Sequence, residues 1–244
     1  MKRRLLLLAS IIGITVFGLP VMADVEVNYA DLNPYISYDG HINASPVAEI
    51  VNNGDKPVYI NNASFDVEDA DNRLMSTIDH AYCIPVVLSP GEKGYIFHAY
   101  TRVDDIADPF SCHIEPHFEE LEMEDESYRY ELSDVALNIL NGEDYEVVGR
   151  ATNTNDVASS NGRVCVVWFD TNKRCIGVSQ SKSLTGLQPG SQQSFEVQGS
   201  DSWMEDQTKI ATYRVIIEEM PNPYNKNKNT SIVHIPYSEM ENAQ

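Results

Sequence analysis

The stretch FDVEDADNRL, residues 65–74, concentrates side chains that bind hard cations. Calcium takes oxygen ligands of this kind, but an EF-type loop also needs glycine at its sixth position and glutamate at its twelfth. Counted from Asp66, those two positions hold Asp71 and Thr77. A hairpin turn, in which Asp and Asn bond to their own backbone, fits the stretch better. A divalent-metal site is the alternative, with these candidate ligands: Asp66, Glu68, Asp69 and Asp71.

The sequence CHIEPH, residues 112–117, has the residue types of a zinc site. Pro116 and the pattern around it predict a strand, on which His113, Glu115 and His117 share one face at steps of about 6.5–7 Å. The two histidines then stand about 13 Å apart, too far for one zinc ion with bonds of about 2 Å. We therefore interpret them as the polar outer face of a strand.

The four cysteines allow three disulfide pairings. Cys83 and Cys112 are expected on different strands, and export of the protein would allow them to pair. Cys165 and Cys175 flank a predicted turn at 171–172, which sets Trp168 opposite Cys175 and leaves the two sulfur atoms about 10 Å apart. The sequence thus allows a Cys83–Cys112 disulfide and predicts that Cys165 and Cys175 stay unpaired.

The chain contains no G-x-S-x-G elbow, no H-E-x-x-H pair and no glycine-rich phosphate loop. We therefore predict no catalytic residue and no cofactor. Tyrosines such as Tyr35, Tyr38 and Tyr100 are an alternative surface for a carbohydrate or a peptide, although their alternation favours packing. Trp168 follows Val164 and Val166 in the inward series of a strand and is expected in the core.

The formal net charge is −20. Such a charge argues against nucleic acid, whose phosphates need clustered Lys and Arg, and against docking on anionic lipid. We interpret it as a charge that keeps the protein dispersed in solution, with cationic partners or divalent ions as the alternative.

The N-terminus carries the pattern of a secretory signal peptide. Lys2, Arg3 and Arg4 precede an apolar run, and Val21 and Ala23 occupy the −3 and −1 positions of a cleavage site. We predict a signal peptide over residues 1–23, with an uncleaved membrane anchor as the alternative. The mature protein is expected to be secreted or held at the cell surface.

The chain also repeats itself. A shift of 101 positions places residues 45–74 on residues 146–175, and after a two-residue deletion the match resumes at a Pro-Gly turn. Both units alternate strand-length runs with turn clusters, which is typical of a sandwich or barrel. The matched residues include these pairs: Asn52 with Asn153, Asp69 with Asp170, and Pro90-Gly91 with Pro189-Gly190.

The second unit, VVGRATNTND…VCVVWFD…LQPGSQQSF, resembles the FxLYD-type domain, a small immunoglobulin-like sandwich of exported bacterial proteins. The namesake strand maps onto Val166, Trp168, Phe169 and Asp170, with Val for the first Phe and Trp for Leu. In the first unit it maps onto Phe65, Val67, Glu68 and Asp69, with Glu in the tyrosine place. The resemblance implies the fold and export, and it implies no chemistry.

We therefore predict an all-β protein with two tandem immunoglobulin-like β-sandwich domains, over residues 24–122 and 123–244. The acidic run at 119–126 is expected to be the joint between them. The expected role is non-catalytic: a binding or spacer module that presents loops and strand edges to a protein or glycan partner. A self-associating structural subunit is the alternative, and a hydrolytic enzyme with a loop-built site comes third.

Overall fold

Runs of β-branched and aromatic residues form strands throughout, so the chain is all-β as predicted. The computed structural model describes residues 25–123, 130–140, 144–199, 209–219, 233–234 and 238–239. The predicted signal peptide, residues 1–23, lies outside this range.

The N-terminal half, residues 25–123, carries ten strands and one 3-10 turn. They are β1 (Val25–Asp31), β2 (Pro34–Ile36), β3 (Ile42–Ala44), β4 (Val47–Asn52), β5 (Val58–Glu68), β6 (Leu74–Ile84), β7 (Val87–Leu88), β8 (Lys93–Phe97), β9 (Thr101–Arg102), η1 (Pro109–Ser111) and β10 (His113–Glu122). The C-terminal half, from residue 130, has β11 (Tyr130–Leu140), β12 (Asp144–Asn153), β13 (Gly162–Phe169), β14 (Cys175–Ser183), β15 (Gln192–Gln198), β16 (Thr212–Glu219), β17 (Val233–His234) and β18 (Ser238–Glu239).

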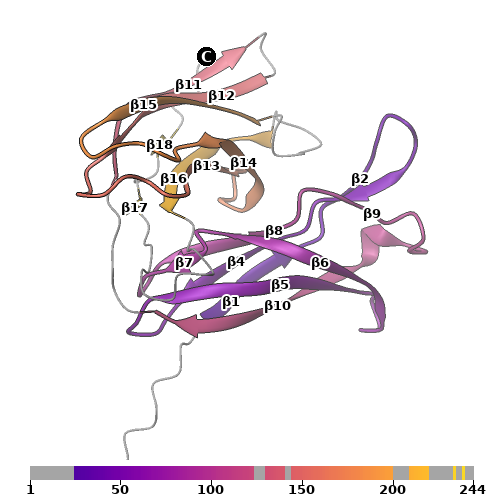
Figure 1. Cartoon of the computed structure of the whole chain (residues 1–244). Helices are drawn as coiled ribbons and strands as arrows, with labels where there is room; N and C mark the ends of the chain where they lie inside the picture. The colour runs from indigo at the N-terminus through magenta and orange to yellow at the C-terminus, as the bar shows by residue number, and fades with distance from the viewer. Residues whose placement is uncertain are drawn as a thin grey trace, which may run out of the picture.

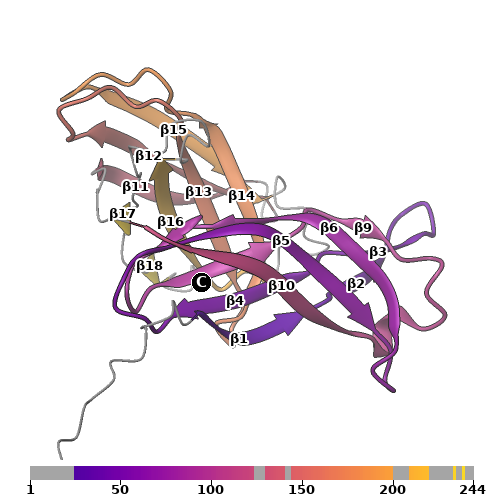
Figure 2. The same cartoon turned by 60° about the horizontal axis from the view of Figure 1, so that its bottom comes forward.

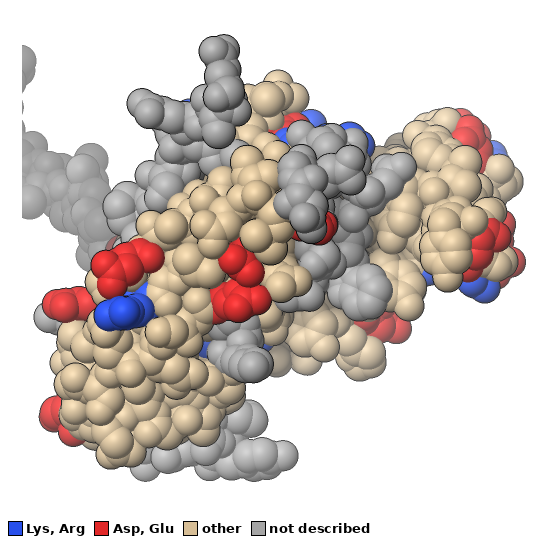
Figure 3. Space-filling model, turned by 90° about the horizontal axis from the view of Figure 1, so that it is seen from above, with Lys and Arg blue, Asp and Glu red and all other residues tan. Residues whose placement is uncertain are grey.

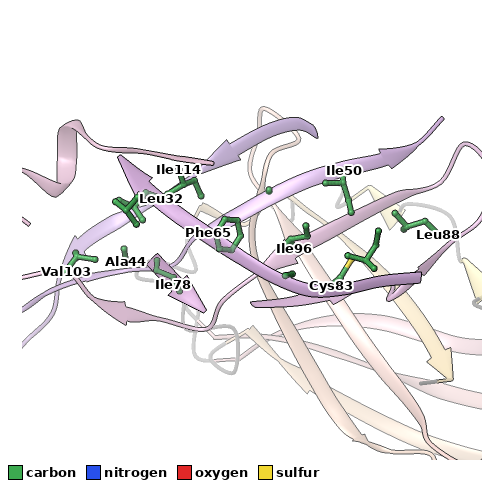
Figure 4. Packing of buried hydrophobic residues seen from close by; sticks show 14 of the residues in the cluster. Leu32, Ala44, Ile50, Phe65, Ile78, Cys83, Leu88, Ile96, Val103 and Ile114 are labelled. Atoms are coloured by element: carbon green, nitrogen blue, oxygen red, sulfur yellow. The ribbon is translucent and has the colours of Figure 1, made fainter. Parts of the chain in front are cut away.

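The two halves share one strand order. In the N-terminal half β1-β4-β8 continues through β6 into β5-β10, and in the C-terminal half β11-β12-β15 faces β14-β13-β16. Each half therefore has two antiparallel layers around a core. Phe65 lies near the middle of the first core, between Ile50, Ile78 and Ile96 (Figure 4).

A buried asparagine closes the same loops in both halves. Asn52 Nδ2 donates to the main-chain oxygen of Leu88 at 2.9 Å, and Asn153 Nδ2 donates to that of Leu187 at 2.8 Å. Both asparagines are fully buried. Because the positions correspond in the sequence repeat, the repeat extends to individual hydrogen bonds.

Half of the stretch expected to join the domains, residues 119–126, is a strand. Residues 119–122 belong to β10, where Glu119 lies opposite Asn61 and Glu122 lies opposite Val58. An edge strand accepts these charges because its outward side chains remain in water. Residues 124–126 lie outside the described range.

The two halves pack against each other through a third apolar cluster. The N-terminal half contributes Val47, Ile84, Tyr95 and Phe97, and the C-terminal half contributes Cys165, Val167, Phe169, Cys175, Val178 and Ile216. The rings of Tyr95 and Phe169 meet edge to face at 5.5 Å. Figures 1 and 2 show β13, β14 and β16 lying across β4 and β8, with β11, β12 and β15 on the far side.

Polar contacts fix the orientation of this interface. Glu218 accepts a hydrogen bond from the main-chain nitrogen of Val86 at 3.0 Å and pairs with Arg163 in its own half. At the other end, Arg174 lies 3.1 Å from the carboxylate of Asp31 and stacks over the ring of Tyr29. Contacts at both ends prevent rotation of one half against the other.

We predict that Asn52→Ala and Asn153→Ala each lower the free energy of unfolding by about 2–3 kcal/mol, because each leaves buried carbonyl oxygens without a donor. Urea denaturation measures the loss. Asn53→Ala, at an exposed neighbour whose side chain donates to Glu26 at 2.9 Å, is the matched control and should change stability by less than about 0.5 kcal/mol. Equal losses at Asn52 and Asn53 would contradict the role of the buried amide.

Candidate functional site

The four candidate metal ligands of the acidic stretch do not converge. Asp66 and Glu68 lie on the outer face of β5, where His117 and His113 of β10 each approach one of them at 3.1 Å. Within the residues that the structure describes, no three His, Cys, Asp or Glu side chains are grouped as a metal site requires.

Asp69 belongs to the hairpin turn. Its Oδ1 accepts hydrogen bonds from the main-chain nitrogens of Asp71 and Arg73, at 2.9 and 3.0 Å. These bonds hold the pKa of Asp69 below its usual value, and the bond from Arg73 has the largest effect. Asp170 accepts the equivalent pair of bonds in the other half, at 2.8 and 2.9 Å. The residues shared by the two acidic turns are thus those that close the turn.

The segment CHIEPH leads from Cys112 into β10, which begins at His113, and the expected common face of its polar residues is confirmed. His113, Glu115 and His117 are exposed and alternate with more buried neighbours. Each histidine faces its own carboxylate on β5. The arrangement provides separate surface ion pairs instead of a shared ligand set.

All four cysteines are free thiols, and the disulfide that the sequence allowed between Cys83 and Cys112 does not form. Cys83 lies near the end of β6, with its Sγ 3.1 Å from the oxygen of Pro85. Cys112 precedes β10, and its Sγ lies 3.4 Å from the oxygen of Asp108. Figure 4 shows Cys83 and Ile114 at opposite ends of the core, and Ile114 follows Cys112 by two residues.

The predicted register around Cys165 and Cys175 is wrong. Cys175 lies opposite Phe169 and Cys165 opposite Gln180, because extra residues bulge β14. Both thiols are buried in the interface between the halves. Burial raises the pKa of both and of Cys83, and a thiol with a raised pKa is a poor nucleophile.

A small hollow of about 550 Å³ lies where two bulges meet on β5 and β6. Asn62 and His80 hold positive φ angles of 48° and 60° at these bulges. The Asn62 amide is braced by Glu119 at 2.8 Å. The strained backbone has a structural explanation in the bulges, and the hollow is open and shallow.

A larger hollow of about 740 Å³ lies on the outer layer of the C-terminal half. This layer faces the viewer in Figure 3, where acidic side chains stand in separate small groups. β11, β12 and β15 line it, together with one residue at the edge of β14. The lining residues are Asp134, Val148, Gly149, Arg150, Gln180, Gln193, Ser194, Phe195, Glu196 and Gln198.

This groove is rich in amides. Its glutamines can both donate and accept hydrogen bonds, and Arg150 is held by Asp134 at 3.6 Å. Asp134 has φ 53° in a bulge that bends β11. Among the described residues that line the groove, none is a histidine, cysteine or tyrosine. Ser194 is thus the one hydroxyl side chain among the described lining residues, and no histidine accompanies it there.

The chain matches none of the protein-family models, and no curated protein matches it either. Within the described residues, no helix has the length and apolar character to cross a membrane.

One buried carboxylate has a pKa in the physiological range. Glu92 is 8% exposed and accepts a hydrogen bond from the main-chain nitrogen of Ser89 at 2.7 Å. Burial raises the pKa of Glu92 to about 7, although the Ser89 bond and the charge of Arg214 oppose the shift. Because the folded state binds this proton more tightly than the unfolded state, the contribution of Glu92 to stability falls as pH rises from about 4.5 to about 7.

We predict that Glu92→Gln stabilises the protein above pH 7 by up to about 3 kcal/mol, the equivalent of the pKa shift. Below pH 4.5 the variant and the natural protein should be similarly stable. Urea denaturation across this pH range measures the difference, and two parallel pH profiles would contradict the assignment.

Proposed function

We propose that this is an exported, non-catalytic binding protein built from two immunoglobulin-like sandwiches related to the FxLYD type. The shared strand order of the halves and the equivalent bonds of Asn52 and Asn153 support the tandem arrangement. The strand groups β1-β4-β8 and β6-β5-β10, which join through the pairing of β8 with β6, agree with an immunoglobulin-like order. Its partner is a protein or glycan outside the cell.

The observation that carries this proposal is the polar groove beside an open sheet edge, on a scaffold whose halves are clamped together. The apolar cluster and the contacts of Glu218 and Arg174 hold the two sandwiches at one angle. A fixed scaffold lowers the entropy cost of binding because the surface needs no ordering. An open edge offers main-chain hydrogen bonds to a partner strand.

Self-association through the same edge is the second candidate, since an unprotected strand is a template for a second copy. It is opposed by the formal net charge of −20 on each chain. Light scattering separates the two: a monomer at all concentrations removes self-association.

The test of the proposed function is saturable capture. The full mature chain, immobilised and exposed to a surface extract of the producing cells, should retain one partner, and soluble chain should compete that partner away. The unfolded chain is the control and should retain none. Turnover of a panel of ester, peptide and glycoside substrates, without a saturable partner, would overturn the proposal.

A further inference from the structure

We infer that the free edge of β15 binds an extended, basic peptide segment as an added strand. The inference rests on the proposed function and identifies the class of partner. β15 is the last strand of its sheet and pairs with β12 alone in the described residues.

The register shows which main-chain groups of β15 are free. The nitrogen of Asn153 donates to the oxygen of Ser191 at 3.0 Å, so this pair is of the hydrogen-bonded type. In an antiparallel ladder such pairs alternate, and the uninterrupted register carries the alternation to Phe195 and Val197. The N–H and C=O groups of Ser194 and Glu196 therefore point away from β12, toward the free edge.

β15 lacks the devices that protect other edges. Among the described strands longer than three residues, β1, β11 and β14 are bulged edge strands and β10 carries Pro116 beside a bulge in its partner. β15 has seven residues, QQSFEVQ, without proline, glycine, lysine or a register shift. β14 approaches β15 at one end, where Gln193 Nε2 donates to the main-chain oxygen of Ser183 at 3.4 Å. Further along, the groove lies between β15 and Gln180 of β14, so space remains open beside Ser194 and Glu196.

The charge of the surface selects a basic occupant. Glu196 is the outward carboxylate on β15 itself, and Glu146 lies diagonally from it, one strand further in on β12. The cation of the groove, Arg150, is already paired with Asp134. A lysine or arginine on the outer face of an added strand would meet the carboxylate of Glu196, whereas a second copy of this acidic chain would be repelled.

The probe is a seven-residue peptide of alternating lysine and valine, with a glutamate–valine peptide as its control, measured by fluorescence anisotropy. The full mature chain should bind the lysine peptide at least about tenfold more tightly than the glutamate peptide. Glu196→Gln should weaken the lysine peptide about threefold and reduce its salt dependence.

Ser194→Pro is the decisive variant, because it removes an outward N–H and no ladder hydrogen bond to β12. It should weaken the lysine peptide about tenfold, the loss expected from one or two hydrogen bonds. Ser194→Ala keeps the N–H and is the matched control, expected within about twofold of the natural chain. Circular dichroism confirms that both variants fold.

A peptide series tests the same point without a variant. One peptide is N-methylated at its odd-numbered residues and another at its even-numbered residues. One of the two should lose binding and the other should keep it, since only one edge of an added strand pairs with β15. No binding of the lysine peptide, equal binding by Ser194→Pro, or dimerisation through β15 would each overturn the inference. If a captured surface partner is lost in Ser194→Pro while no basic peptide binds, the proposed function stands and the basic occupant is wrong.

Discussion

Burial of both faces of β13 is the constraint on which the rest of the structure depends. Its sequence, GRVCVVWF, is almost continuously apolar. Val164, Val166 and Trp168 fill the core of the C-terminal half, while Cys165, Val167 and Phe169 face the N-terminal half. Full burial of a side chain such as Val or Phe is worth about 1.5–3 kcal/mol. The C-terminal half on its own would expose this face to water, so the two halves stabilise each other.

The interface also decides which surfaces remain available. It covers the outer side of β13, β14 and β16, and leaves the outer side of β11, β12 and β15 on the far side of the molecule (Figure 1). The Arg163–Glu218 pair lies at the edge of the covered side, where Glu218 also holds Val86. Burial raises the pKa of Glu218, and the guanidinium of Arg163 opposes that shift. The outer layer and the outward faces of β5, β6 and β10 stay clear of this interface.

Much of the fold could be predicted from the sequence. Alternation and turn residues are local signals, so the all-β class, the inward position of Trp168 and the strand character of CHIEPH were accessible. The sequence repeat already matched Asn52 with Asn153, and the structure shows that the two residues make equivalent hydrogen bonds. Errors arose where one extra residue changed a register, as in β14 opposite Cys165. A bulge adds a residue to a strand without changing the kinds of residue that the strand contains, so it leaves no local signal in the sequence.

The groove and the open edge could not be predicted in the same way. Gln192–Gln198 alternates like any half-buried strand, and its place at the end of a sheet depends on pairings made far away in the chain. The interface between the two halves could not be predicted for a similar reason. An apolar run predicts a strand buried on both sides, but it does not identify what covers the second side.

The most direct test is amide hydrogen exchange along β15 in the full mature chain. The amides of Phe195 and Val197 should be protected, since they point into the ladder with β12, and those of Ser194 and Glu196 should exchange rapidly. The lysine–valine peptide should then protect Ser194 and Glu196 selectively. Uniform protection of all four amides in the free protein would contradict an open edge.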